Sequence, residues 1–128
     1  MAWNITRSGQ FIEKEVLKYA TGRELTDSVV VDANAFPMPA SREARNIIPA
    51  GTILKLSATD STKVVEYNGS GTIKGILAHS VEIMASSSAG VEPAPMYFHS
   101  AVFATSSIVG FTAYASAVQS SLPTCLWL

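Results

Sequence analysis

The sequence is poor in charge and nearly free of cysteine. Lys, Arg, Asp and Glu make up 15% of its 128 residues, whereas an average soluble domain has roughly 25%. The formal net charge is -1, so the chain has no general attraction for a polyanion, and we expect no direct binding of nucleic acid. The single cysteine, Cys125, cannot form a disulfide within the chain and belongs to no metal-binding pattern.

Charge is also unevenly distributed along the chain. Glu92 is the last charged residue, and residues 93–128 contain no Lys, Arg, Asp or Glu. Large uncharged or apolar surfaces of soluble proteins tend to mark contacts with other molecules. We therefore expect part of this segment to be core and part to face another protein chain.

No membrane segment is expected. Residues 100–118 are about long enough to cross a bilayer, but they include six Ser and Thr residues and have no flanking basic residue. At the N-terminus, Arg7, Glu13 and Lys14 interrupt any apolar stretch of the kind that a signal peptide needs. The sequence therefore indicates synthesis and use in the cytoplasm, or assembly into a larger particle there.

The length of the chain predicts one domain with a tail. We expect residues 1–22 to form an extended N-terminal arm and residues 23–128 to form a β-rich domain. Residues 12–19 have apolar positions at helical spacing, so a short helix is the alternative there. The β-branched run Val29–Val31 predicts a strand, whereas Pro37 and Pro39 predict a connection without a regular ladder.

The centre of the chain predicts a compact β-unit. Residues 52–67 are expected to form a hairpin, followed by a tight turn at residues 68–71 and one strand over residues 72–83, with a bulge at Gly75. Beyond it we expect a loop over residues 85–95, a strand over 95–104, a short helix over 109–121 and a final strand over 122–128. Five to seven short strands predict a mainly β fold, a small barrel or sandwich with one or two short helices.

The sequence shows little that could perform chemistry. It has no G-x-S-x-G nucleophile motif. His79 and His99, with Glu82 as the nearest third ligand, are better explained as strand residues than as a metal site. The glycines at 69, 71 and 75 lack the spacing of a phosphate-binding loop and are followed by a strand-like segment. We expect no enzyme activity, no metal and no cofactor.

One alternative is a carrier or small-barrel binding module. Residues 48–67 have some similarity to lipoyl and biotinyl carrier domains, which present a modifiable lysine at the tip of a hairpin. Lys63 is the candidate lysine, but the acidic or Met neighbours that those carriers show are missing here.

The order of motifs resembles the head decoration proteins of tailed bacteriophages, the family of the lambda head protein D. The resemblance covers residues 47–108. It consists of a P/A-G-T-x-L start, a strand ending in tyrosine, a glycine-rich turn, a G-I-L strand and a late strand in which Ser100 replaces the usual glycine. The matching positions are 50–54, 63–67, 68–71, 75–77 and 96–102, and the turn residues among and beside them are Pro49, Gly51, Asn68, Gly69, Gly71 and Gly75.

This resemblance implies a β-tulip fold and a homotrimer that binds the major capsid protein. Such a trimer sits on the outer surface of an expanded capsid, at three-fold and quasi-three-fold positions, and stabilises the shell of the virion against the pressure of packaged DNA. It also implies that the N-terminal arm adds a strand to a capsid sheet. The arm residues expected to make this contact are Trp3, Ile5, Thr6, Phe11 and Ile12. A tail or head-completion protein that forms hexameric rings is a further alternative.

Overall fold

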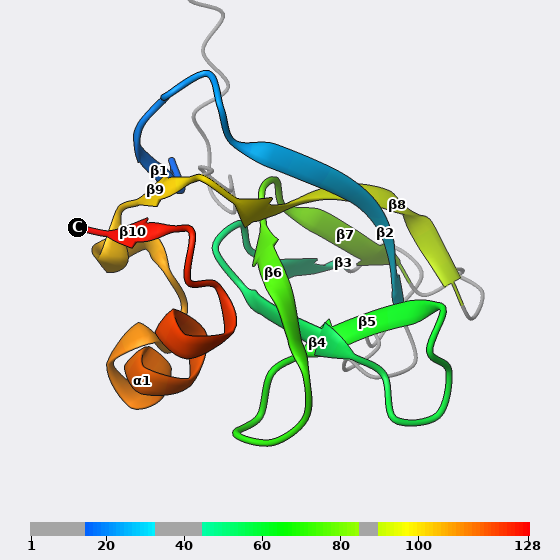
Figure 1. Ribbon diagram of the computed structural model, residues 1–128. Coiled ribbons are helices and arrows are strands. Elements are labelled where there is room, and N and C mark those ends of the chain that lie inside the picture. Colours follow the sequence, from blue (N-terminus) through cyan, green and yellow to red (C-terminus); the bar gives the residue numbers. More distant parts are fainter. Residues whose placement is uncertain (1–14, 33–44, 85–89) are drawn as a thin grey trace, which may run out of the picture.

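The computed structural model describes residues 15–32, 45–84 and 90–128, and these residues form ten strands, a 3₁₀ helix and one α-helix (Figure 1). The fold is therefore mainly β, as the sequence predicts. The elements are β1 (Leu17–Tyr19), β2 (Leu25–Asp32), β3 (Arg45–Ile48), β4 (Ile53–Leu56), β5 (Lys63–Glu66), β6 (Ile73–Leu77), β7 (Val81–Met84), β8 (Gly90–His99), β9 (Val102–Phe103), η2 (Thr105–Ser107), α1 (Phe111–Ser121) and β10 (Leu126–Trp127).

The centre of the molecule is a closed barrel in the strand order β2-β5-β4-β6-β8. The predicted hairpin is present, because β4 and β5 pair antiparallel with Leu56 opposite Val64. β5 also pairs with β2, in parallel. Closing the sheet in this way leaves no free strand edge within the barrel.

Two apolar clusters hold the fold together. One fills the barrel around Val31, Leu54, Leu77 and Met96, which are at most 2% exposed. The other lies between the barrel and the C-terminal part of the chain, with Phe103 at its centre. The side chains of successive strand residues point to opposite faces, so strands with apolar residues in sequence serve both clusters.

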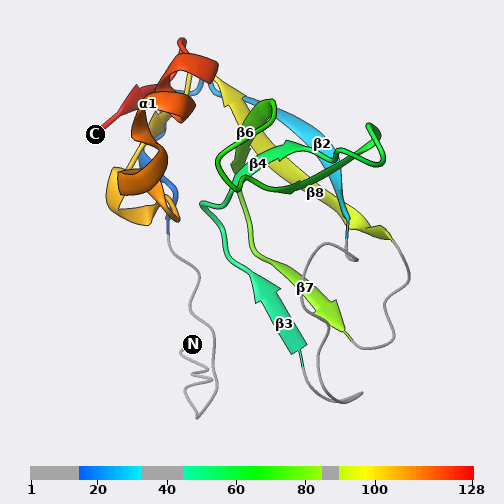
Figure 2. The same cartoon turned by 90° about the horizontal axis from the view of Figure 1, so that it is seen from below.

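A second sheet, in the order β1-β9-β10, lies at one end of the barrel. β1 pairs antiparallel with β9, and β10 pairs with β9 in parallel. In Figure 1 this sheet and α1 lie together on one side of the molecule, next to the C-terminus. Figure 2 shows the two-stranded ribbon of β3 and β7 projecting away from the barrel, on a different side.

Several expected boundaries were wrong. Residues 72–83 form β6 and β7 with a bend between them, because β6 belongs to the barrel and β7 pairs with β3. The part of the expected loop at residues 90–95 is the first half of β8, which pairs with β2 although it contains Pro93 and Pro95. Local turn residues predicted a loop there, and pairing with β2 overrides them.

Residues 16–19, near the end of the predicted arm, are part of the folded domain. Val16 is 4% exposed and packs in the C-terminal cluster, and β1 pairs with β9. Residues 17–19 form a strand rather than a helix. A free arm must therefore end before Val16 rather than at residue 22. Residues 1–14 lie outside the described residues.

The bulge expected at Gly75 is present. The β4–β6 ladder shifts register between Leu54, opposite Gly75, and Lys55, opposite Ile73. A Cβ atom at position 75 would lie 2.4 Å from the carbonyl oxygen of Tyr97 on β8. Glycine therefore lets β6 approach β8 closely at the point where the barrel bends.

Gly51 joins the barrel to the C-terminal part. Its N–H donates to the carbonyl of Leu77 (2.8 Å), and its own carbonyl accepts a hydrogen bond from the N–H of Val109 (3.0 Å). A parallel bridge also connects Thr52 to Val109. Gly51 has a φ of +93°, and a Cβ atom there would lie 2.1 Å from the carbonyl oxygen of Ser107. Only glycine permits both this conformation and this contact.

We expect Gly51→Ala to lower the free energy of unfolding by about 3 kcal/mol, because the added methyl group must displace the Ser107 backbone. Urea unfolding followed by circular dichroism measures this loss. Gly22→Ala is the matched control, since Gly22 also has a positive φ, of +75°, but no described atom lies within 4 Å of the position that its added methyl group would take. The control should lower stability by about 1 kcal/mol. Equal losses in the two variants would contradict the steric role of Gly51.

Candidate functional site

The predicted arm residues all lie outside the described residues. The structure therefore places none of their side chains. They are Trp3, Ile5, Thr6, Phe11 and Ile12.

The predicted turn residues are described, and they shape the backbone at several separate places. Gly69 and Gly71 have φ values of +107° and +101° in the turn between β5 and β6. The Asn68 side-chain oxygen accepts a hydrogen bond from Lys55 Nζ (2.8 Å), which fixes this turn to β4. Pro49 begins the turn before β4, where its carbonyl accepts from the Thr52 hydroxyl (2.7 Å). These residues build the fold and do not converge on one site.

The sheet at the end of the barrel has an aromatic inner face. Phe103 is fully buried, and its ring stacks on Trp127 with the ring centroids 4.6 Å apart. The ring of Phe111, at the start of α1, also stacks on Trp127, with the centroids 5.7 Å apart. Leu17 packs against the same cluster. One indole ring thus connects β9, β10 and α1.

The outer side of this end exposes large apolar side chains. Tyr19, Leu126 and Leu128 are each 59–60% exposed. Tyr19 and Leu126 both lie opposite Val102 of β9, one on each side, so their side chains share one face of the sheet. Val109, just before α1, is also exposed. The charge-free part of the sequence thus includes exposed apolar surface as well as core.

Trp127 also carries a polar group without a partner. Its indole N–H is buried and makes no hydrogen bond within the described part of the chain. Buried donors of this kind are rare in folded proteins, because losing the hydrogen bond to water without a replacement is costly. The candidate functional site is therefore this end of the molecule, which we call the C-terminal face: β10 with Leu128, the exposed side of α1, and Tyr19 of β1.

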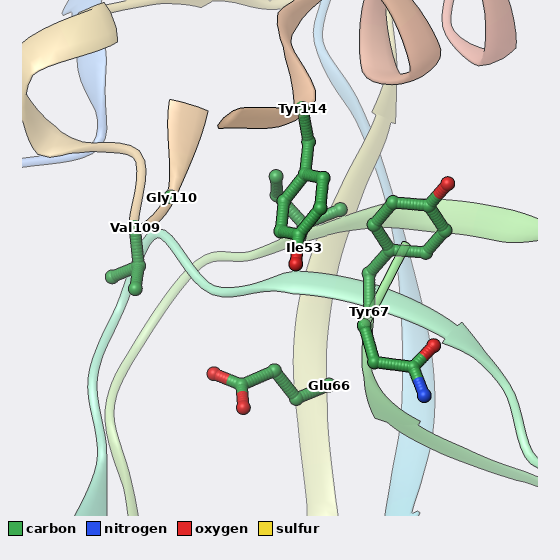
Figure 3. A pocket seen from close by; sticks show the side chains of 7 residues that line it. Ile53, Glu66, Tyr67, Val109, Gly110 and Tyr114 are labelled. Atoms are coloured by element: carbon green, nitrogen blue, oxygen red, sulfur yellow. The ribbon is translucent and has the colours of Figure 1, made fainter. Parts of the chain in front are cut away.

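A small hollow lies beside the C-terminal face. It has a volume of about 250 Å³ and lies between the end of β5 and the start of α1. Figure 3 shows the Tyr114 side chain reaching in from α1, with Glu66 across from it. The rings of Tyr67 and Tyr114 meet edge to face, with centroids 5.0 Å apart. Residues from separate elements form this hollow, so no local motif in the sequence indicated it.

His99 and Ser100 form a polar junction between β8 and β9. The Ser100 hydroxyl and His99 Nδ1 are 2.7 Å apart, and the Ser100 N–H donates to the Thr124 hydroxyl (3.3 Å). Among the described non-glycine residues, Ser100 alone has a positive φ, of 56°.

The described side chains include no group of three His, Cys, Asp or Glu residues that could hold a metal ion.

A carboxylate stabilises the turn before β2. Glu24 accepts hydrogen bonds from the hydroxyl (2.5 Å) and the N–H (3.0 Å) of Thr21. The hydroxyl bond is the main reason that the pKa of Glu24 is lowered, while desolvation opposes the shift. Because the folded pKa lies below the unfolded one, this contribution to stability is present above the unfolded pKa and is lost as the pH falls through the folded pKa.

Lys63 does not lie at a hairpin tip. It is the first residue of β5 and pairs with Val30 of β2 in the barrel. Its ammonium group is 3.8 Å from the Asp60 carboxylate.

The helices of the described residues include none that is long and apolar enough to cross a membrane.

Comparisons with known proteins give no family for this chain. No model of a known protein family matches it, and no curated protein does. The resemblance of residues 47–108 to the phage decoration proteins therefore stays a prediction from the sequence.

We expect Trp127→Ala to lower the free energy of unfolding by about 3 kcal/mol, because both ring stacks on Trp127 are lost. Trp127→Phe keeps an aromatic ring and removes the unpartnered N–H, so it should lower stability by less than about 1.5 kcal/mol. Urea unfolding at a fixed protein concentration, followed by circular dichroism, compares the two. A loss as large for phenylalanine as for alanine would show that ring stacking is not what Trp127 supplies.

Proposed function

We propose that this protein is a capsid decoration protein of a tailed bacteriophage. It binds as a homotrimer to the major capsid protein on the outside of the expanded head, at three-fold and quasi-three-fold positions. There it stabilises the shell of the virion against the pressure of the DNA inside. It is made in the host cytoplasm and acts without catalysis, cofactor or direct contact with nucleic acid.

The backbone at Ser100 supports the proposal most directly. The family pattern has a glycine at this position of the late strand. Here the backbone of Ser100 has a φ of 56°, in the left-handed region that glycine adopts most readily. The position therefore has the conformation that a glycine there would favour, although the residue differs. Hydrogen bonds from the Ser100 N–H to Thr124 and between its hydroxyl and His99 stabilise this conformation.

The position of β1 also supports the proposal. Within the described three-stranded sheet, β1 pairs with β9 on one side and has a free edge on the other. Residues 1–14 connect to the fold through Glu15, directly before this edge. An N-terminal segment attached in this way can pair with a sheet of another protein through backbone hydrogen bonds, with alternate side chains supplying specificity. Trp3, Ile5, Phe11 and Ile12 are the apolar side chains available for such pairing.

Three linked arms would explain tight binding to a large shell. Each arm can be weak by itself, since binding of one arm raises the effective concentration of the other two. The binding positions exist only where expansion has brought neighbouring capsid subunits into place. Binding then favours the expanded shell by mass action.

The alternative functions have less support. A carrier domain needs its lysine at an exposed tip, and Lys63 lies at the start of a barrel strand. A ring-forming tail or head-completion protein differs in the number of subunits, which the mass in solution reveals.

We expect the protein to bind expanded capsids that lack decoration, and to bind unexpanded shells much more weakly. Removing residues 1–14 should abolish binding and leave the oligomer intact, because the deletion ends before Val16 and β1. Co-sedimentation with both kinds of shell measures binding, and light scattering measures the oligomer.

Point variants make this test sharper. Trp3→Ser should weaken binding to expanded capsids at least roughly tenfold, because one apolar anchor is lost from each of three arms. Ser8→Ala, in the same segment, should bind like the unchanged protein. Equal binding to expanded and unexpanded shells, or full binding after removal of residues 1–14, would contradict the proposal.

A further inference from the structure

We infer that the C-terminal face is the surface through which copies of this chain associate with one another, with Leu126 and Leu128 next to the three-fold axis. This inference rests on the proposed function, which requires a trimer but leaves the surface between its subunits unassigned. The occupant of the face is a second copy of this chain.

Charge is sparse at this end of the described surface, where Lys18 of β1 and Glu15 just before it are the exposed charged residues. The barrel carries exposed or half-buried charged residues, such as Asp27, Lys55 and Lys74. By contrast, β9, η2, α1 and β10 contain no charged residue. The exposed positions of α1 are instead small or uncharged, for example Ser116 and Gln119. A surface built mostly from these uncharged elements offers little to a basic or acidic partner and matches another surface of the same kind.

Leu126 and Leu128 are held in an exposed position. They are two residues apart on an extended segment, so both side chains point away from the Trp127 stack. They are 60% and 59% exposed. The Leu126 N–H and the Leu128 N–H donate to the carbonyls of Ala101 and Phe103, both at 2.9 Å. The backbone thus fixes two leucines toward the outside.

β10 has a free edge in the described sheet, where it pairs with β9 alone. The neighbouring indole N–H of Trp127 is buried and has no acceptor among the described residues. Unpaired edges that lack a lysine or a proline favour pairing with another chain. A subunit placed against this edge can supply the backbone partner that β10 lacks, whereas the buried indole N–H stays out of its reach.

Symmetry connects these features. In a closed ring of three subunits each contact joins two different patches, and only the positions next to the axis come close to their own equivalents in the other copies. Leu126 and Leu128 of the uncharged β10 segment tolerate this meeting, whereas charged side chains there would repel one another. The C-terminal face also includes Tyr19 of β1, so the arms of three copies would leave from around the same axis.

The main test compares the mass in solution of two variants. Leu126→Ser combined with Leu128→Ser should convert the oligomer to a monomer at concentrations where the unchanged protein is fully trimeric. Leu25→Ser is the matched control, because Leu25 is a leucine with 49% exposure on β2, outside the C-terminal face. It should remain trimeric. Light scattering gives the mass, and circular dichroism verifies that each variant is folded.

A cross-linking test detects contact between copies directly and needs no variant that becomes monomeric. Leu128→Cys should form disulfide-linked pairs on mild oxidation, because residue 128 of each of the three subunits would lie close to the axis. Cys125 is 5% exposed, so the introduced thiol is the accessible one. Leu25→Cys should stay uncross-linked under the same conditions.

The outcomes separate the inference from the proposed function. A trimer that persists in the double serine variant, without cross-linking at position 128, would overturn the inference and leave the decoration function standing. Cross-linking at position 128 but not at 25, together with a monomeric serine variant, would support it. An unchanged protein that is monomeric both in solution and on expanded capsids would overturn the trimer itself. If the unchanged protein fails to bind expanded capsids while Leu128→Cys still cross-links, only the proposed function is contradicted.

Discussion

The close backbone contact at Gly51 is the constraint on which the arrangement of the whole molecule depends. The barrel and the C-terminal sheet are separate sheets, and hydrogen bonds from Gly51 to Leu77 and from Val109 to Gly51 join the barrel to the segment that leads into α1. Because this contact leaves no room for a side chain, the position of α1 relative to the barrel is set by backbone atoms. Apolar packing around Phe103 then fills the space that this contact defines.

This arrangement separates two tasks within a short chain. The barrel supplies stability, since it closes on itself and has a continuous apolar interior. The β1-β9-β10 sheet, as described, has free edges and exposed leucines, and it is the surface that we propose for association. A small domain can tolerate such a surface only if the rest of its core is well packed, because net stability is a small difference between large opposing contributions. The exposed apolar residues are therefore concentrated where association would cover them.

Much of the fold could be predicted from the sequence, and the candidate site only in part. Hairpins with clear turns, such as residues 52–67, follow from local patterns, and so does the bulge at Gly75. The pairing of β8 with β2 could not be read locally, because Pro93 and Pro95 indicate a loop until a partner strand is known. The absence of charge after Glu92 indicated a contact surface, but nothing in the spacing showed that Trp127 would join Phe103 to Phe111.

The C-terminal sheet brings together segments that are far apart along the chain. Leu17 of β1 lies opposite Phe103 of β9, whereas β4 and β5 of the barrel are neighbours in sequence and pair across a short turn. Contacts between distant segments form slowly, because closing a long loop loses much conformational entropy before any contact compensates for it. We therefore expect the barrel hairpin to form early and the β1–β9 pair to form late. A chain that is still folding then lacks the finished C-terminal face, and this order limits association between partly folded copies.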